Sequence, residues 1–239
     1  MTKFLSVLCT ASALTIAAAS AQAATVQMNV TNVVGKWTAW TDGKSVTTTA
    51  TGANPAELRW GKGDKKSGYD FTGLAPSGPH AEGEDFNLGI FKHLNYPIDA
   101  GSSITGATLE VSYSVYVDGD TSTLQSYTSV FEFKHWETDN GSKDWWGNWS
   151  NPTTCANGKK NGSGVNENGC ADRVTAKLNA GLSDAIQTEN GKYYLTVSGF
   201  SYSGEEMDEF WTKENATNSA TLKASFTHER NVQPAPVPL

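Results

Sequence analysis

Clusters of acidic residues in turn-like segments could bind an ion. Three such clusters occur, at 118–120, 139–144 and 205–209, and the candidate ligands in them are Asp118, Asp120, Asp139, Asp144, Glu205 and Asp208. Ca²⁺ takes six to eight oxygen ligands, and the loops at the ends of a β-sandwich can supply them. No cluster has the full spacing of an EF-hand loop. Ca²⁺ is therefore the candidate cofactor, and the simpler explanation is that these residues are solvated turn residues.

A group of tryptophans could bind a carbohydrate. Trp145, Trp146 and Trp149 stand in a short polar run beside Asp139 and Asp144. An exposed indole can stack on a sugar ring while neighbouring Asp and Asn side chains bond its hydroxyls. Alternatively, the rings form a small satellite core beneath a long loop. The pattern leaves both interpretations open.

The histidines and carboxylates give weaker signals for catalysis. No Gly-x-Ser-x-Gly motif accompanies the four histidines, which are His80, His93, His135 and His228. Three of them fall in or beside expected strands, where ordinary polar positions explain them. Two of them with an Asp or Glu could also form a zinc site. For a glycosidase the carboxylates to inspect are Glu132, Glu137 and Glu205, but the sequence does not select a pair.

The cysteines predict one disulfide. Cys9 lies in the leader described below, which leaves Cys155 and Cys170 as an even pair. The residues between them are mostly Gly, Asn, Lys and Ser, so a bridge would supply the order that a core cannot. A zinc site is the alternative, but two cysteines alone lack its usual spacing and partners.

The N-terminus predicts export. Residues 1–23 contain Lys3, an apolar run and an Ala21-Gln22-Ala23 cleavage site, as in a signal peptide. The apolar run is shorter than a membrane span, so we expect no transmembrane segment in the mature chain as given. The formal net charge is −7, and loss of Lys3 makes it −8. This acidity argues against a nucleic-acid partner.

The mature sequence has the pattern of strands. Residues Leu109 to Val117 alternate apolar and polar side chains and end at an Asp118-Gly119-Asp120 turn. Residues Phe86 to Leu94 also alternate, and we expect Phe86, Leu88 and Ile90 to share one face. Further strands are expected at Val26 to Val30, Ser45 to Thr51, Ser129 to Trp136, Tyr193 to Tyr202 and Thr221 to Thr227. Many short strands with turn signals predict an all-β, jelly-roll-like β-sandwich over residues 24–230, with long loops.

One short helix and a tail complete the expected organisation. Val174, Leu178, Leu182 and Ile186 recur at steps of four, which indicates a short helix over Asp172 to Ile186 that Gly181 interrupts. Residues 231–239 are rich in proline and predict an extended spacer without its own core, which either joins a segment that is missing here or is a frayed end.

Several segments together resemble the choice-of-anchor K domain and the overlapping THxN family of exported bacterial proteins. These segments are 57–61, 67–73, 86–98 and 225–231. The THxN name calls for Asn two places after His228, where this chain has Arg230 and then Asn231. The resemblance implies export from a Gram-negative bacterium, a β-rich fold and cell-surface placement, but no activity. It also implies a sorting tail of the PEP-CTERM kind, with residues 231–239 as a proline-rich linker to that missing tail.

These observations together predict a non-enzymatic exported protein at the cell surface or in the extracellular matrix. Its expected role is a scaffold for cohesion or adhesion, with surface glycans or other matrix proteins as partners. The first alternative is a carbohydrate-binding module that uses the exposed tryptophans. The second alternative is a secreted glycan-active enzyme.

Overall fold

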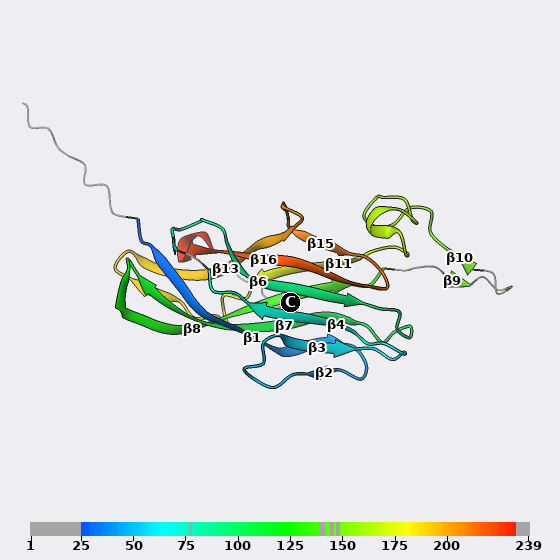
Figure 1. Ribbon diagram of the computed structural model, residues 1–239, viewed down its shortest axis with the longest axis horizontal. Helices are drawn as coiled ribbons and strands as arrows, with labels where there is room; N and C mark the ends of the chain where they lie inside the picture. The colour runs from blue at the N-terminus through cyan, green and yellow to red at the C-terminus, as the bar shows by residue number, and fades with distance from the viewer. Residues whose placement is uncertain (1–24, 77, 139–141, 144–145, 147–148, 233–239) are drawn as a thin grey trace, which may run out of the picture.

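Two antiparallel sheets make up most of the chain in the computed structural model, which describes residues 25–76, 78–138, 142–143, 146 and 149–232 (Figure 1). The six-stranded sheet has the order β15 (Glu209–Thr212), β11 (Asp172–Leu178), β8 (Asp120–Trp136), β7 (Ile104–Val117), β1 (Met28–Asp42) and β5 (Pro79–His80). The eight-stranded sheet has the order β12 (Ile186–Thr188), β13 (Gly191–Tyr202), β16 (Ala216–His228), β6 (Phe86–Asn95), β4 (Ser67–Gly73), β3 (Ala56–Trp60) and β2 (Thr47–Thr48), and β14 (Glu205–Met207) pairs with β13. The predicted all-β, sandwich-like fold is confirmed.

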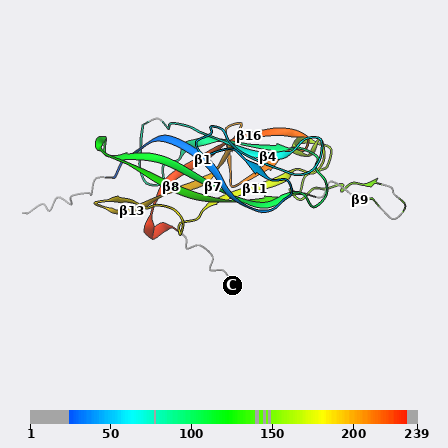
Figure 2. The same cartoon turned by 90° about the horizontal axis from the view of Figure 1, so that it is seen from below.

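A separate arm extends from one end of the sandwich in both views (Figures 1 and 2). We define the disulfide arm as the described residues between 142 and 171. It contains the paired strands β9 (Ser142–Lys143) and β10 (Trp149–Ser150) and the 3₁₀ turn η1 (Gly164–Asn166). A second 3₁₀ turn, η2 (Glu229–Asn231), follows β16.

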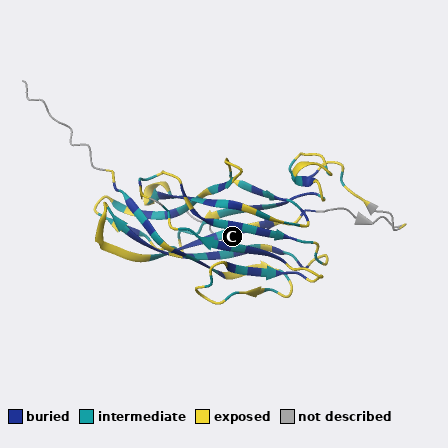
Figure 3. Cartoon of the chain, in the orientation of Figure 1, coloured by how far each residue is buried: buried dark blue, intermediate teal, exposed yellow. Residues whose placement is uncertain are grey.

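The core lies between the two sheets and is rich in aromatic side chains. Phe91 of β6 stacks on Phe133 of β8 at 5.2 Å between ring centroids, and Trp37 of β1 meets the edge of Phe133 at 5.3 Å. All three side chains are buried. Each strand presents alternate residues inward, and Figure 3 shows buried and less buried positions alternating along the strands.

Strand β7 and its hairpin follow the predicted alternation. The turn residues Asp118 and Gly119 have φ values of 50° and 76°, as a tight two-residue hairpin between twisted strands requires. Four alternate residues of β7 are buried, and they are Leu109, Val111, Tyr113 and Val115.

Strand β6 departs from the predicted alternation because it contains a β-bulge. Its partner β16 pairs Leu222 with Gly89 and Lys223 with Asn87, so Leu88 is an extra residue. The bulge reverses the phase of the strand, and Phe91 is buried while Ile90 is only partly buried. The expectation that Ile90 shares the face of Phe86 and Leu88 is therefore wrong.

The predicted helix over Asp172 to Ile186 is also wrong. These residues form β11, a turn and the start of β12. A step of four residues is also two steps of two, so Val174 and Leu178 share one face of a strand as well as one face of a helix. Val174 is fully buried in β11, while Leu182 lies in the turn with 67% of its surface exposed.

The predicted leader, residues 1–23, lies outside the described residues, as does most of the proline-rich linker, residues 231–239. In the described part of the chain, no helix is long and apolar enough to cross a membrane.

Candidate functional site

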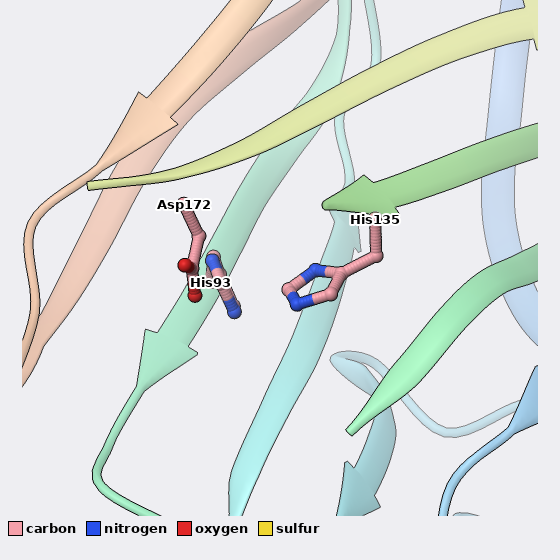
Figure 4. Close-up of side chains that lie close together, drawn as sticks. All are labelled: His93, His135 and Asp172. Carbon is pink, nitrogen blue, oxygen red and sulfur yellow. The ribbon is translucent and has the colours of Figure 1, made fainter. Parts of the chain in front are cut away.

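Three buried side chains that could hold a metal ion meet at one end of the sandwich. His93 comes from β6 in one sheet, while His135 of β8 and Asp172 of β11 come from the other. One ligand atom from each lies within 4.8 Å of the other two. Figure 4 shows the three side chains close together between the strands that carry them.

Local strand geometry directs each of these side chains inward. The β6 bulge puts His93 on the same face as the buried Phe91. In β8, His135 follows Phe133 at a spacing of two and so faces the same core. Asp172 begins β11 and pairs with Thr212 of β15.

The hydrogen bonds of His93 indicate its tautomer. The Thr212 Oγ1 atom lies 2.8 Å from His93 Nδ1 and 3.3 Å from the Asp172 carbonyl oxygen. Since a carbonyl oxygen can only accept, the Thr212 hydroxyl donates its hydrogen bond to the Asp172 backbone oxygen. The same hydroxyl oxygen then accepts a hydrogen bond from the Nδ1–H group of His93. His93 Nε2 then carries a lone pair, and this buried atom has no protein partner.

The charged form of His93 is disfavoured. Burial lowers the pKa of His93 well below its usual value, and the neighbouring His135 lowers it further. The ring is therefore neutral at physiological pH, which is the form that ligates metals.

Asp172 is a buried carboxylate with one satisfied and one unsatisfied oxygen. Its Oδ1 atom accepts a hydrogen bond from the Thr138 backbone N–H at 2.8 Å, whereas Oδ2 has no partner. Burial raises the pKa of Asp172 well above its usual range, and the charges of Glu137 and Glu214 raise it further. A positive charge beside Asp172 would relieve this cost.

His135 connects the buried cluster to the surface. Its Nδ1 atom lies 2.6 Å from Tyr69 Oη, and its Nε2 atom lies 3.3 Å from Glu137 Oε2. Burial raises the pKa of Tyr69 well above its usual value, with Asp172 and Glu137 adding to the effect, so its phenol stays protonated. The Glu137 side chain is 39% exposed, so the cluster lies one side chain beneath solvent.

A second group of carboxylates and an aromatic side chain border the cluster. Asp172, Glu137 and Glu214 also bring carboxylate oxygens within 4.8 Å of one another, and Asn95 Nδ2 donates to Glu214 Oε1 at 3.2 Å. The Trp60 indole packs near both histidine rings, at 5.9 Å from His93 and 5.5 Å from His135 between centroids. The site therefore combines imidazole nitrogens, carboxylate oxygens and an aromatic wall.

The predicted disulfide between Cys155 and Cys170 is present, and it closes the disulfide arm. Inside the loop, the amides of Asn157 and Asn166 donate to each other's side-chain oxygens, each at 3.0 Å. The base of the arm joins the cluster, because Thr138 Oγ1 donates to the Cys170 carbonyl oxygen at 2.7 Å. Thr138 thus links the two features, because it bonds both Cys170 of the bridge and Asp172 of the cluster.

Four of the residues proposed for Ca²⁺ lie apart from this cluster, and the other two, Asp139 and Asp144, lie outside the described residues. Asp118 and Asp120 are exposed in the β7–β8 hairpin, while Glu205 and Asp208 are exposed in and beside β14 of the other sheet. Asp118 Oδ1 accepts from the Gln27 backbone N–H at 2.8 Å. Among the described residues, neither group that could hold a metal includes any of these four carboxylates. Calcium binding there stays a prediction.

The residues proposed for sugar binding are only partly described. Trp146 is 84% exposed in the disulfide arm, and Trp149 starts β10. Asp139, Asp144 and Trp145 lie outside the described residues.

The carboxylates proposed for a glycosidase are dispersed. Glu132 lies on β8 and its Oε1 atom accepts a hydrogen bond from Asn179 Nδ2 at 2.7 Å. Glu137 contacts His135, and Glu205 lies in the other sheet. Catalysis by any pair of them stays a prediction.

Sequence reasoning did not assemble the cluster, although it named its parts. The alternation of Phe131, Phe133 and His135 was a usable signal that His135 is buried. The β6 bulge hid the inward orientation of His93, because it shifts the alternation of the strand. The expected helix hid the inward orientation of Asp172, which begins strand β11 instead. No sequence signal brings the ends of β6, β8 and β11 together, because sheet order is a long-range property.

Comparison with protein-family models finds none that matches the chain, and no curated protein matches it either. The resemblance to choice-of-anchor K domains stays a prediction.

Proposed function

We propose that the chain acts outside the cytoplasm as a non-enzymatic β-sandwich scaffold for cohesion or adhesion at a cell surface or in a matrix. The observation that carries the proposal is the disulfide arm, which extends from one end of the sandwich, is bridged at Cys155–Cys170 and has Trp146 84% exposed. Exposed aromatic side chains are typical anchors of protein contacts.

Two features of the molecule support this role. The disulfide agrees with an oxidising compartment, where such bonds persist. The titratable cluster of His93, His135 and Asp172 is buried between the sheets, where a large substrate has no access. The cluster therefore suits a structural role better than turnover.

Bead assays with purified, oxidised protein test the proposal. Beads coated with the wild-type protein should cluster with one another or attach to bacterial envelope fragments more than beads coated with albumin do. We expect Trp146→Ala to reduce this attachment without changing the melting temperature, because the side chain is exposed. Leu182→Ala is the matched control, since Leu182 is an exposed apolar residue outside the arm.

Attachment equal to that of albumin beads would contradict the proposal. Equal loss in the Trp146→Ala and Leu182→Ala variants would show that the arm is not the contact surface.

Carbohydrate binding through the arm is the second candidate function, and the exposure of Trp146 favours it as well. Trp136 is also exposed, at 47%, but Arg173 covers its ring at 4.3 Å from the centroid. A glycan array separates the two functions, because a sugar-binding module gives saturable binding that Trp146→Ala removes. A scaffold that contacts proteins gives no such signal.

A further inference from the structure

Two buried atoms without partners belong to one cluster. His93 Nε2 can only accept a hydrogen bond or bind a cation in the tautomer that Thr212 imposes, and Asp172 Oδ2 is a buried carboxyl oxygen without a hydrogen-bond partner among the described residues. A metal cation can bind both atoms at once. Leaving buried polar atoms unpaired is costly, so a group that both atoms can bind belongs between them.

The set of donors selects the kind of cation. Two imidazoles with carboxylates suit Zn²⁺, whereas Ca²⁺ and Mg²⁺ prefer oxygen alone. His93, His135 and Asp172 supply two nitrogens and one oxygen, whereas the Glu137 carboxylate contacts His135 but groups with Asp172 and Glu214. We infer that His93, His135 and Asp172 form a three-ligand Zn²⁺ site that joins the two sheets of the sandwich, with a water in the fourth position.

The distances fit this inference after small adjustments of the side chains. Zinc ligands at about 2.1 Å in a tetrahedron lie about 3.4 Å from one another. The ligand atoms of His93, His135 and Asp172 lie within 4.8 Å of one another, so binding draws the widest pair together by at most about 1.4 Å.

Second-shell hydrogen bonds orient both imidazoles. Thr212 Oγ1 accepts a hydrogen bond from the Nδ1–H group of His93, which orients the Nε2 atom toward the ion. Without zinc, the Glu137 carboxylate accepts a hydrogen bond from His135 Nε2, so the Tyr69 hydroxyl donates to Nδ1 at 2.6 Å. Zinc at Nε2 requires the ring proton on Nδ1 instead, where Tyr69 Oη accepts the hydrogen bond. Thr212 is therefore a positioning residue that the ion does not touch.

The bound ion would also hold the base of the disulfide arm. Thr138 and Asp172 border the arm in the sequence, and the Thr138 backbone N–H donates to Asp172 Oδ1. Coordination through Oδ2 fixes the same carboxylate from its other side. Zinc should therefore slow proteolysis within the arm as well as stabilise the sandwich.

Titration of metal-free protein with Zn²⁺ tests the site directly. We expect one ion per chain by calorimetry and a rise of several degrees in melting temperature, since an ion bound to the folded state stabilises it. Co²⁺ should give the intense visible absorption of a tetrahedral site. Ca²⁺ at the same concentration should not displace Co²⁺ from this site, because a site with two imidazole nitrogens disfavours Ca²⁺.

Conservative variants locate the site and guard against misfolding. Asp172→Asn keeps an oxygen for the Thr138 bond and should fold, yet it should lose the zinc-dependent shift and the Co²⁺ bands. Thr212→Val should weaken zinc binding about 10- to 100-fold, as loss of a second-shell partner does. His228→Gln is the control, because His228 bonds the Asn190 carbonyl oxygen outside the cluster.

Two results would overturn the inference. One is a wild-type protein that takes up no zinc at one ion per chain, which would leave water to satisfy the cluster. The other is zinc uptake that Asp172→Asn and Thr212→Val leave unchanged, which would place the ion elsewhere. Neither result bears on attachment by the arm, so this inference and the proposed function can fail separately.

Discussion

His80 illustrates what a buried ring without partners does to stability. The ring stacks on Phe86 at 4.3 Å between centroids, and neither nitrogen has a hydrogen-bond partner. Burial lowers the pKa of His80 below its usual value of 6.5, and the Glu84 charge offsets this in part. The folded protein therefore binds the His80 proton less tightly than the unfolded chain does.

The sign of this shift sets a pH dependence. The contribution of His80 to stability is complete above pH 6.5 and is lost as the pH falls through the lowered pKa of the folded state. We expect His80→Phe, which keeps an aromatic ring against Phe86, to melt with a shallower dependence on pH below 6.5 than the wild type. Calorimetry of metal-free protein across this range measures both slopes. Equal slopes would show that His80 titrates without cost in the folded protein.

Among the elements, the disulfide arm depends most on its covalent bridge. Its described residues contribute few apolar side chains, and it meets the sandwich mainly through polar contacts such as Lys213–Glu167 at 2.9 Å. Exposed ion pairs of this kind contribute little to stability. The bridge across a separation of 15 residues contributes about 3 kcal/mol by limiting the open states of the loop.

Removal of the bridge should therefore loosen the arm and leave the sandwich intact. In a Cys155→Ser, Cys170→Ser double variant we expect arm amides to exchange up to about 100-fold faster, the equivalent of about 3 kcal/mol. Amides of β7 should keep their exchange rates and serve as the internal control. Hydrogen exchange read by mass spectrometry would contradict this account if both regions changed together.

Elements also show how much of the structure the sequence could predict. The alternation of Leu109 to Val117 and the Asp118-Gly119 turn predict β7 and its hairpin, because both signals are local. The β6 bulge and the strand β11 escaped prediction for physical reasons. A bulge changes the phase without changing the composition, and a spacing of four suits one face of a strand as well as one face of a helix.

The candidate site escaped prediction because it forms only in the assembled molecule. Its three central residues lie on β6, β8 and β11, and the Thr212 partner comes from β15. The sequence indicates that two histidines with an acidic residue could bind zinc, but sheet order decides which ones meet. The bulge in β6 then turns His93 toward the others.

At the scale of the whole molecule, the cluster ties separate parts together. His93 belongs to the eight-stranded sheet, His135 and Asp172 belong to the six-stranded sheet, and the arm ends beside Asp172. An ion bound there would link both layers and the base of the arm that carries Trp146. The proposed scaffold and the inferred zinc site thus meet at one end of the sandwich.

Diffraction from crystals of zinc-loaded protein, recorded on both sides of the zinc absorption edge, tests the central inference most directly. The account expects one anomalous peak per chain between the sheets, about 2 Å from His93 Nε2 and from an Asp172 carboxylate oxygen. A peak only at the surface would contradict it. So would a cluster filled by ordered water with no anomalous signal.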